Sequence, residues 1–109
     1  MNVRLYTLQR LSALIMVPLI IGHLIVIFYA TRKGLTAGDV LARTRGSFLW
    51  GSYYALFVLA AAVHGAIGVR SVAREWGRMV GRNLDLLMWG AGLVLAGLGL
   101  RAVWAVVIG

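Results

Sequence analysis

The chain has no cysteine and few charged residues. Its 109 residues include 11 Lys and Arg, but only 3 Asp and Glu and 2 His. The lack of cysteine excludes disulfide bonds, thiolate ligands for zinc or iron–sulfur clusters, and cysteine nucleophiles. Charged residues make up 13% of the chain, whereas about a quarter is usual in a soluble domain. This composition argues against an ordinary soluble protein.

Hydrophobic residues are correspondingly abundant, at 61% of the sequence. A single domain of this length buries only about 60 to 70% of the surface of its unfolded chain, so much apolar surface must face lipid. The net charge of +8 would suggest nucleic acid as the partner of a soluble protein. Here most arginines flank apolar runs instead of forming one polar face, so no nucleic-acid partner is expected.

Three apolar runs, at about 10–31, 47–70 and 84–108, are each long enough to cross a membrane, which takes about 20 residues in a helix. They lack the alternation typical of strands, and three strands cannot close a barrel in lipid. The sequence therefore predicts an all-α membrane protein with three transmembrane helices in a single domain, residues 1–109. Between the first two runs, a short helix is expected to begin near Thr36.

Basic residues are distributed unequally between the two predicted membrane faces. The face with the N-terminus carries six arginines: Arg4, Arg10, Arg70, Arg74, Arg78 and Arg82. The other face carries Arg32, Lys33, Arg43 and Arg45, with Arg101 expected to snorkel toward them. The positive-inside rule then predicts a cytoplasmic N-terminus.

Few residues in the chain can carry chemistry. The first two runs contain no carboxylate, which argues against a proton- or cation-coupled carrier such as a small multidrug transporter. Phosphate-binding, zinc-protease and serine-hydrolase motifs are absent from the sequence. Two histidines, His23 and His64, lie inside apolar runs, where an ionisable side chain is costly and usually functional. Imidazole without thiolates or carboxylates suits haem iron better than a zinc site, which needs about four ligands.

The neighbours of the two histidines are compatible with a haem. Small residues, Gly22 beside His23 and Gly65 and Gly68 near His64, leave room for a flat macrocycle or serve helix packing alone. Possible partners for the haem propionates lie within three turns of His64: Arg70, Ser71 and Arg74. The arginines are also expected at this position from the positive-inside rule alone.

Glycines recur at intervals of seven in the third run, at Gly90, Gly92, Gly97 and Gly99. Such strips allow a second helix to approach closely, although glycine is common in membrane helices for other reasons.

The two histidines are predicted to lie at different depths. His23 lies about 3 Å beyond the middle of the first run and His64 about 10 Å from the middle of the second, toward the opposite side. In antiparallel helices the two rings then differ in depth by about 13 Å, which is too far for one shared iron. If both are ligands, each serves a different haem, and the second ligand of each haem comes from another chain.

Two segments resemble a known family. Residues 8–13, LQRLSA, are similar to the Q/H-R-x-[ST]-[GA] opening of the membrane-anchor cytochrome b subunits of succinate dehydrogenase and fumarate reductase. Residues 64–76 read H-x-x-x-G-x-x-x-V-x-x-E-W and resemble the family's second-span signature H-x-x-x-G-x-x-x-V-x-x-D-Y. The likeness also extends to the number of spans, their order and the short length.

The resemblance implies a haem b-binding anchor of a succinate:quinone oxidoreductase, with no dehydrogenase chemistry on this chain. The implied partners are a flavoprotein subunit, an iron–sulfur subunit and a second anchor, identical or homologous, that completes the helical bundle. The implied location is the bacterial inner membrane. Two haems per complex are expected, with quinone as the substrate. A haem-free structural anchor is the alternative, in which both histidines are merely buried and hydrogen-bonded.

The family's functional residues map onto particular positions. His64 matches the haem ligand, and His23 resembles the additional first-span ligand of two-haem relatives. The quinone residues would be Arg10, the adjacent hydroxyl of Ser12, and Trp76, which stands where the family has Tyr. An indole N–H can still donate to a quinone carbonyl, although a phenol is lost.

Overall fold

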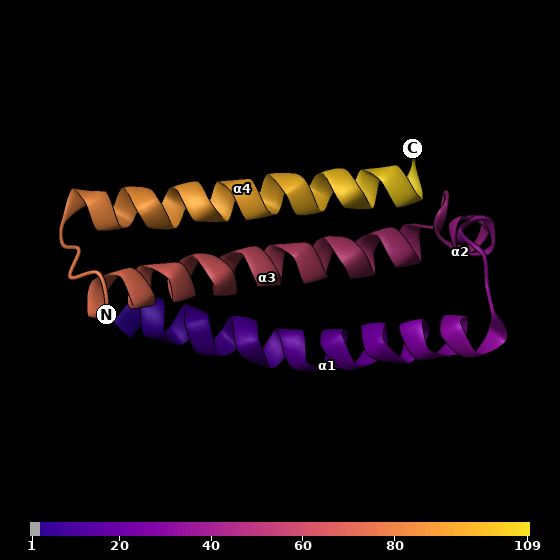
Figure 1. Ribbon diagram of the computed structural model, residues 1–109, viewed down its shortest axis with the longest axis horizontal. Coiled ribbons are helices and arrows are strands. Elements are labelled where there is room, and N and C mark those ends of the chain that lie inside the picture. Colours follow the sequence, from indigo (N-terminus) through magenta and orange to yellow (C-terminus); the bar gives the residue numbers. More distant parts are fainter. Residues whose placement is uncertain (1–2) are drawn as a thin grey trace.

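Three long helices lie side by side in the computed structural model, which describes residues 3–109. The chain forms, in order, α1 (Val3–Lys33), α2 (Ala37–Thr44), α3 (Phe48–Glu75) and α4 (Arg82–Val107). Neighbouring long helices run antiparallel, and α3 lies between α1 and α4, packing against both (Figure 1). The arrangement measures 48 × 24 × 22 Å, so its long axis exceeds the roughly 30 Å of membrane hydrocarbon.

The three long helices are each long and apolar enough to span a membrane. This confirms the predicted fold class. The helices extend beyond the predicted spans, because α1 already begins at Val3 and α3 continues to Glu75. Hydropathy marks only the part of a helix that fits the hydrocarbon, whereas backbone hydrogen bonding continues through the arginine-rich ends into the interfaces. Residues 1 and 2 of the predicted domain lie outside the described part of the chain.

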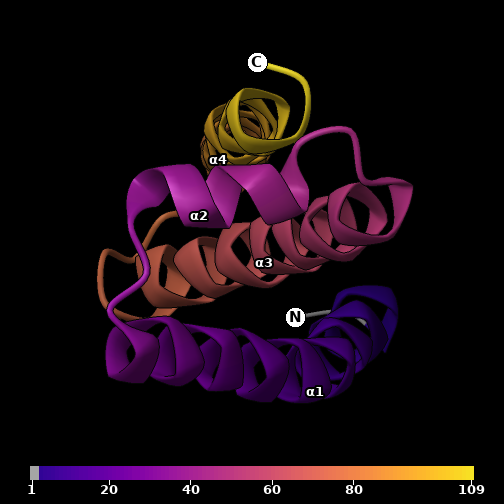
Figure 2. The ribbon, with the colours of Figure 1, turned by 90° about the vertical axis from the view of Figure 1, so that its right-hand side faces the viewer.

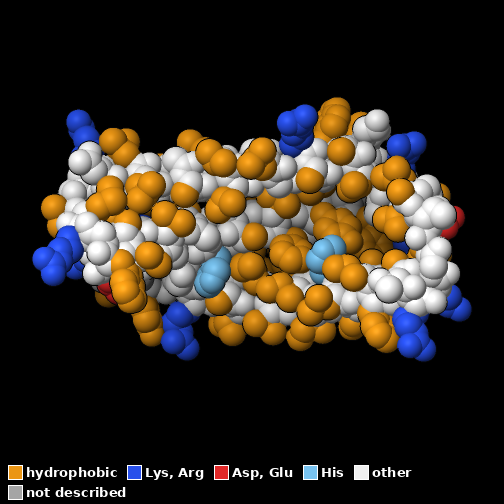
Figure 3. Space-filling model, in the orientation of Figure 1, with side chains coloured by type: hydrophobic (Ala, Val, Ile, Leu, Met, Phe, Trp, Pro, Cys, Tyr) orange, Lys and Arg blue, Asp and Glu red, His pale blue; other side chains and the backbone are white. Residues whose placement is uncertain are grey.

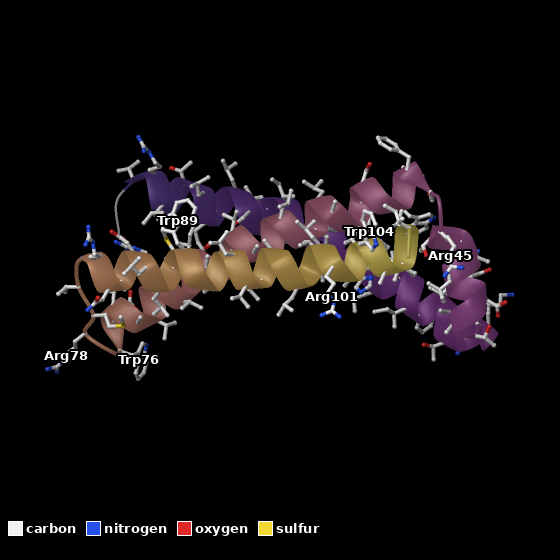
Figure 4. The ribbon with its side chains drawn as sticks, turned by 90° about the horizontal axis from the view of Figure 1, so that it is seen from above. Arg45, Trp76, Arg78, Trp89, Arg101 and Trp104 are labelled. Carbon is white, nitrogen blue, oxygen red and sulfur yellow. The ribbon has the colours of Figure 1, made fainter. Side chains whose placement is uncertain are left out.

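Most of the surface is apolar, as expected for a protein surrounded by lipid. Figure 3 shows hydrophobic side chains along the whole length and basic side chains mostly toward the two ends. Three tryptophans are exposed: Trp76 and Trp89 toward one end of the helices, and Trp104 toward the other. Aromatic side chains of this kind are typical of the two membrane interfaces. Arg101 is exposed on α4 and projects from the side of that helix (Figure 4).

Small residues form the contact between α3 and α4. A Cβ added to Gly92 would lie 3.2 Å from Cβ of Ala66, and one added to Gly99 would lie 2.5 Å from Cγ1 of Val58. Nothing described lies within 4 Å of such an atom on Gly90 or Gly97. One of the two predicted glycine strips therefore allows close packing inside the chain, while the other faces outward.

Packing between α1 and α3 depends on Tyr53, whose hydroxyl donates a hydrogen bond to the backbone oxygen of Leu19. A Cβ on Gly22 would lie only 2.6 Å from this hydroxyl oxygen, so glycine is required for the close approach. This contact lies just beyond Pro18, which interrupts the backbone hydrogen bonding of α1.

The short helix α2 lies across the ends of the long helices (Figure 2). It begins after Thr36, as predicted, with a capping box in which Thr36 Oγ1 accepts from Asp39 N at 3.2 Å and Thr36 N donates to Asp39 Oδ2 at 2.9 Å. At its other end, Thr44 Oγ1 donates to the backbone oxygen of Val106 at 2.7 Å. The bond from Thr44 attaches α2 to the C-terminal end of α4.

Candidate haem and quinone sites

His64 is half-buried on α3 and faces α1. Its Nδ1 lies 3.4 Å from Oγ of Ser12, which is 5% exposed. The same Oγ donates to the backbone oxygen of Gln9 at 3.0 Å. The structure thus brings together the predicted haem ligand and one of the predicted quinone residues.

His23 is half-buried on α1 and is surrounded by aromatic side chains. Its ring makes edge-to-face contacts with Tyr54 and Phe57, each at 5.6 Å between ring centroids. Its Nδ1 is buried and has no hydrogen-bond partner among residues 3–109. The two histidines therefore have different surroundings, one beside a hydroxyl and the other among aromatic rings.

Contacts between α1 and α3 fix the relative depth of the two rings. Ser12 is level with His64 on the neighbouring helix, and His23 lies eleven positions, or about 16 Å, further along α1. On α3, the His23 contact Phe57 lies seven positions, or about 10 Å, from His64. These estimates bracket the offset of about 13 Å inferred from the sequence. The two histidine side chains reach the same face at separate places along the long axis (Figure 3), so they do not share one iron within this chain.

Two polar side-chain atoms without described partners lie near His64, one on α3 and one on α1. Gly68 and Ser71 are four and seven positions after His64 and share its face of the helix. The hydroxyl of Ser71 and the side-chain oxygen of Gln9 are both buried without a described hydrogen-bond partner. A Cβ on Gly68 would lie 3.8 Å from Nε2 of Gln9. Ser71 can donate to a carboxylate, which fits the predicted contact with a haem propionate.

Gln9 was not among the residues predicted for either site, although it belongs to the LQRLSA segment. Its buried, unpartnered oxygen could not be anticipated from sequence, because it depends on the approach of α3. The sequence feature that could have pointed to Gln9 is its place at the Q/H position of the family's opening motif.

Arg70 faces α4 and not His64. Its Nε lies 3.4 Å from Oδ1 of Asp85, forming an ion pair between α3 and α4. Six positions rotate a side chain by about 240° around a helix, which explains the different face. Arg70 can contact a propionate only by giving up or sharing Asp85, whereas Arg74 is exposed in the last turn of α3.

The three predicted quinone residues are not brought together within this chain. Arg10 is exposed, and its guanidinium donates to the hydroxyl of Tyr6 at 3.1 Å. Ser12 lies two positions further on, about 200° around the helix, and is buried against α3. Trp76 caps the C-terminal end of α3, is 84% exposed, and projects away from the helices near Arg78 (Figure 4). A quinone contacted by all three would need surfaces from another subunit.

Two of the three glycines expected to make room for a macrocycle are used in packing. A Cβ on Gly65 would lie 2.9 Å from Cδ1 of Leu95 on α4, and Gly22 adjoins Tyr53. Gly68 alone remains on the face of His64 within the described chain.

No group of three or more His, Cys, Asp or Glu side chains within residues 3–109 could hold a metal ion. A haem iron makes a smaller demand, because the porphyrin supplies four nitrogens and a chain needs to add only one axial imidazole. His64, with Gly68 and the unpartnered Ser71 on its face of α3, fits that demand.

The fold and these residues define a multi-pass membrane protein with three apolar helices and one histidine in each of the first two. The family model for the succinate dehydrogenase/fumarate reductase transmembrane subunit matches residues 1–100, and the chain belongs to that family. This confirms the family resemblance of the LQRLSA and H-x-x-x-G segments. No curated protein and no solved structure matches the chain.

Proposed function

We propose that this chain is the haem b-binding membrane anchor of a succinate:quinone oxidoreductase. The observation that carries the proposal is the placement of His64, an imidazole inside an apolar helix with a buried hydroxyl at its Nδ1. In a chain of this family, such an imidazole is suited to be an axial ligand of haem iron. Bound haem would supply one-electron transfer.

The residues around His64 would hold the rest of the haem. Gly68, which has no side chain, would leave space beside the ring, and the hydroxyl of Ser71, which has no described partner, would donate to a propionate. Arg74 adds a cation at the same end of α3, and Arg70 adds a second one if Asp85 releases it.

His23 would ligate a second haem deeper in the membrane. A second anchor, identical or homologous, would contribute the other protein ligand of each haem at matching depth. This chain is therefore half of a larger helical bundle, and the outward-facing strip of Gly90 and Gly97 suits a helix of that partner.

The flavoprotein and iron–sulfur subunits would dock at the end that carries Trp76 and Arg78 (Figure 4). Quinone would bind at the boundary between membrane and soluble subunits, where Arg10 would supply a cation and Trp76 an indole N–H. Ser12 is buried against α3 and its hydroxyl already donates to the backbone oxygen of Gln9, so it would not donate to the quinone. The anchor orients electron carriers and quinone, while succinate oxidation or fumarate reduction takes place on the soluble subunits.

The membrane would be the bacterial inner membrane, with the N-terminus in the cytoplasm. The six arginines of the N-terminal face and the four basic residues of the opposite face support this orientation.

The alternative is a haem-free structural anchor, and the packing roles of Gly22 and Gly65 favour it. A reduced-minus-oxidised spectrum of the complex purified in mild detergent separates the two functions. The haem anchor predicts a b-type spectrum, together with co-purifying flavoprotein, iron–sulfur and second anchor subunits. A complex that contains the flavoprotein and iron–sulfur subunits but lacks the b-type difference bands would exclude the haem-binding function. A haem-free monomer without those subunits would exclude both functions.

A further inference from the structure

The contact between Ser12 and His64 carries an inference about how the ligand is oriented. We infer that Ser12 is a positioning residue for His64, accepting the Nδ1–H of the ring and leaving the lone pair on Nε2 to bind iron. This rests on the proposed function, in which His64 is a haem ligand. It gives Ser12 a role distinct from quinone binding.

The number of hydrogen atoms at the contact determines which side chain, Ser12 or His64, donates the hydrogen bond. A serine hydroxyl has one hydrogen and two lone pairs. Ser12 Oγ donates its hydrogen to the backbone oxygen of Gln9 at 3.0 Å, three positions earlier in the same helix. The same Oγ lies 3.4 Å from Nδ1 of His64. Since the single hydroxyl hydrogen is already used, the hydrogen between the two side chains must come from the imidazole.

A neutral imidazole carries one N–H, so a hydrogen on Nδ1 leaves Nε2 unprotonated. The opposite tautomer would place the Nδ1 lone pair against the lone pairs of Ser12 Oγ. In that tautomer Nδ1 would face a hydroxyl that is only 5% exposed and already donates to Gln9, so the ring nitrogen would have no hydrogen bond at this contact, which is unfavourable for a buried polar atom. Ser12 therefore selects the tautomer that a metal ligand requires.

His23 lacks this arrangement. Its Nδ1 is buried without an acceptor in the described part of the chain, and its ring contacts are aromatic. A change at Ser12 should therefore act on the haem at His64 and leave a haem at His23 unaltered.

An accepted Nδ1–H bond increases the basicity of the ligating nitrogen. A more basic ligand favours ferric over ferrous iron and lowers the midpoint potential of the haem. Ser12→Ala removes the acceptor and should raise that potential, up to a tenfold change in the ferric/ferrous equilibrium, which is about 59 mV for one electron. Ser12→Thr keeps the hydroxyl and should have the wild-type potential. Ser12→Cys offers a weaker acceptor of similar size and should give a smaller rise in the same direction.

The experiment is a potentiometric titration of b-haem absorbance in the intact detergent-purified complex, with an electron paramagnetic resonance spectrum of the ferric haem. Ser52→Ala is the matched control, because it removes an exposed hydroxyl from α3 far from His64. It should leave both measurements unchanged. If Ser12→Ala does not assemble, Ser12→Cys provides the same readout.

The outcomes separate the inference from the proposed function. A raised potential with an altered ferric spectrum, or a haem lost in Ser12→Ala and recovered in Ser12→Thr, supports the inference. A wild-type potential and spectrum in Ser12→Ala and Ser12→Cys would overturn it, provided His64→Ala has lost that haem. A full haem content in His64→Ala would overturn the proposed ligand itself.

Discussion

Arg70 and Asp85 form the ion pair that connects α3 to α4, with Arg70 Nε 3.4 Å from Asp85 Oδ1. The Arg70 side chain is 16% exposed and that of Asp85 is 59% exposed, so solvent screens the attraction. Exposed pairs of this kind typically contribute about 0–1 kcal/mol. The pair therefore orients Arg70 more than it stabilises the bundle.

A double-mutant cycle on this pair should give a small coupling energy. Arg70→Gln, Asp85→Asn and the double variant are expected to reveal less than about 1 kcal/mol between the two side chains. The measurement is thermal or denaturant unfolding of the purified complex. A coupling several times larger would mean that the pair is buried by another subunit.

Gly99→Ala should destabilise the packing of α3 and α4. The new Cβ would lie 2.5 Å from Cγ1 of Val58, and overpacking of this kind costs about 1–3 kcal/mol. The melting temperature of the complex should fall. Gly97→Ala is the control for packing inside this chain, because its Cβ meets nothing described within 4 Å and should leave the contact of α3 and α4 unchanged.

The control also tests the proposed second anchor. If a partner helix covers Gly97, the alanine variant should release that subunit during purification while this chain keeps its own stability. An equal loss of stability from both alanine variants would contradict the assignment of the two glycine strips.

The spans, their order and the short α2 helix could be predicted from the sequence, because hydropathy and capping are local properties. The sequence does not predict where α1 begins or where α3 ends, because helical hydrogen bonding continues past the apolar stretch. The sequence also does not predict which way each glycine faces. Gly92 and Gly97 both belong to seven-residue repeats, and only the position of α3 shows that Gly92 faces this helix while Gly97 does not.

Arg10→Leu and Trp76→Phe should each lower quinone reduction. The first removes a cation at the predicted membrane boundary, and the second removes the indole N–H while keeping an aromatic ring. Succinate oxidation with a water-soluble artificial acceptor should remain largely intact, because that chemistry takes place on the soluble subunits. Equal losses in both assays would indicate failed assembly instead of a quinone site.

For the candidate haem site, the sequence proposes His64, Gly68 and Ser71 from their proximity along the chain, and their positions on α3 place them on one face of that helix. The sequence groups Arg70 with them because it lies within three turns of His64, but helical rotation turns Arg70 toward Asp85. It assigned Ser12 only to quinone, since the contact with His64 joins residues 52 positions apart. Long-range contacts between helices were the part that local patterns could not supply.

Acidification should loosen the start of α2. Hydrogen bonds from the backbone and then the side chain of Thr36 hold the pKa of Asp39 below its ordinary value of 3.8. The stabilisation from the ionised carboxylate is therefore complete above that value and is lost as the pH falls through the lower folded-state pKa. Hydrogen exchange at the first amides of α2, corrected for the intrinsic effect of pH, should show reduced protection in acid. In Asp39→Asn this change should be absent, and a wild-type protein with constant protection would contradict the prediction.

The haem content should distinguish the roles of the two histidines. His23 and His64 differ in depth by about 10–16 Å along their helices, so each would ligate its own haem with a partner ligand at the same level. The measurement is haem b per flavin, with one flavin per complex. We expect about two in the wild type and about one in His23→Ala, with the haem near Ser12 retained. His64→Ala should lose that haem. It should also assemble less well, because His64 lies at the contact between α3 and α1. A wild-type ratio of one that His23→Ala leaves unchanged would make His23 a structural residue, packed against Tyr54 and Phe57, and His64 the sole ligand.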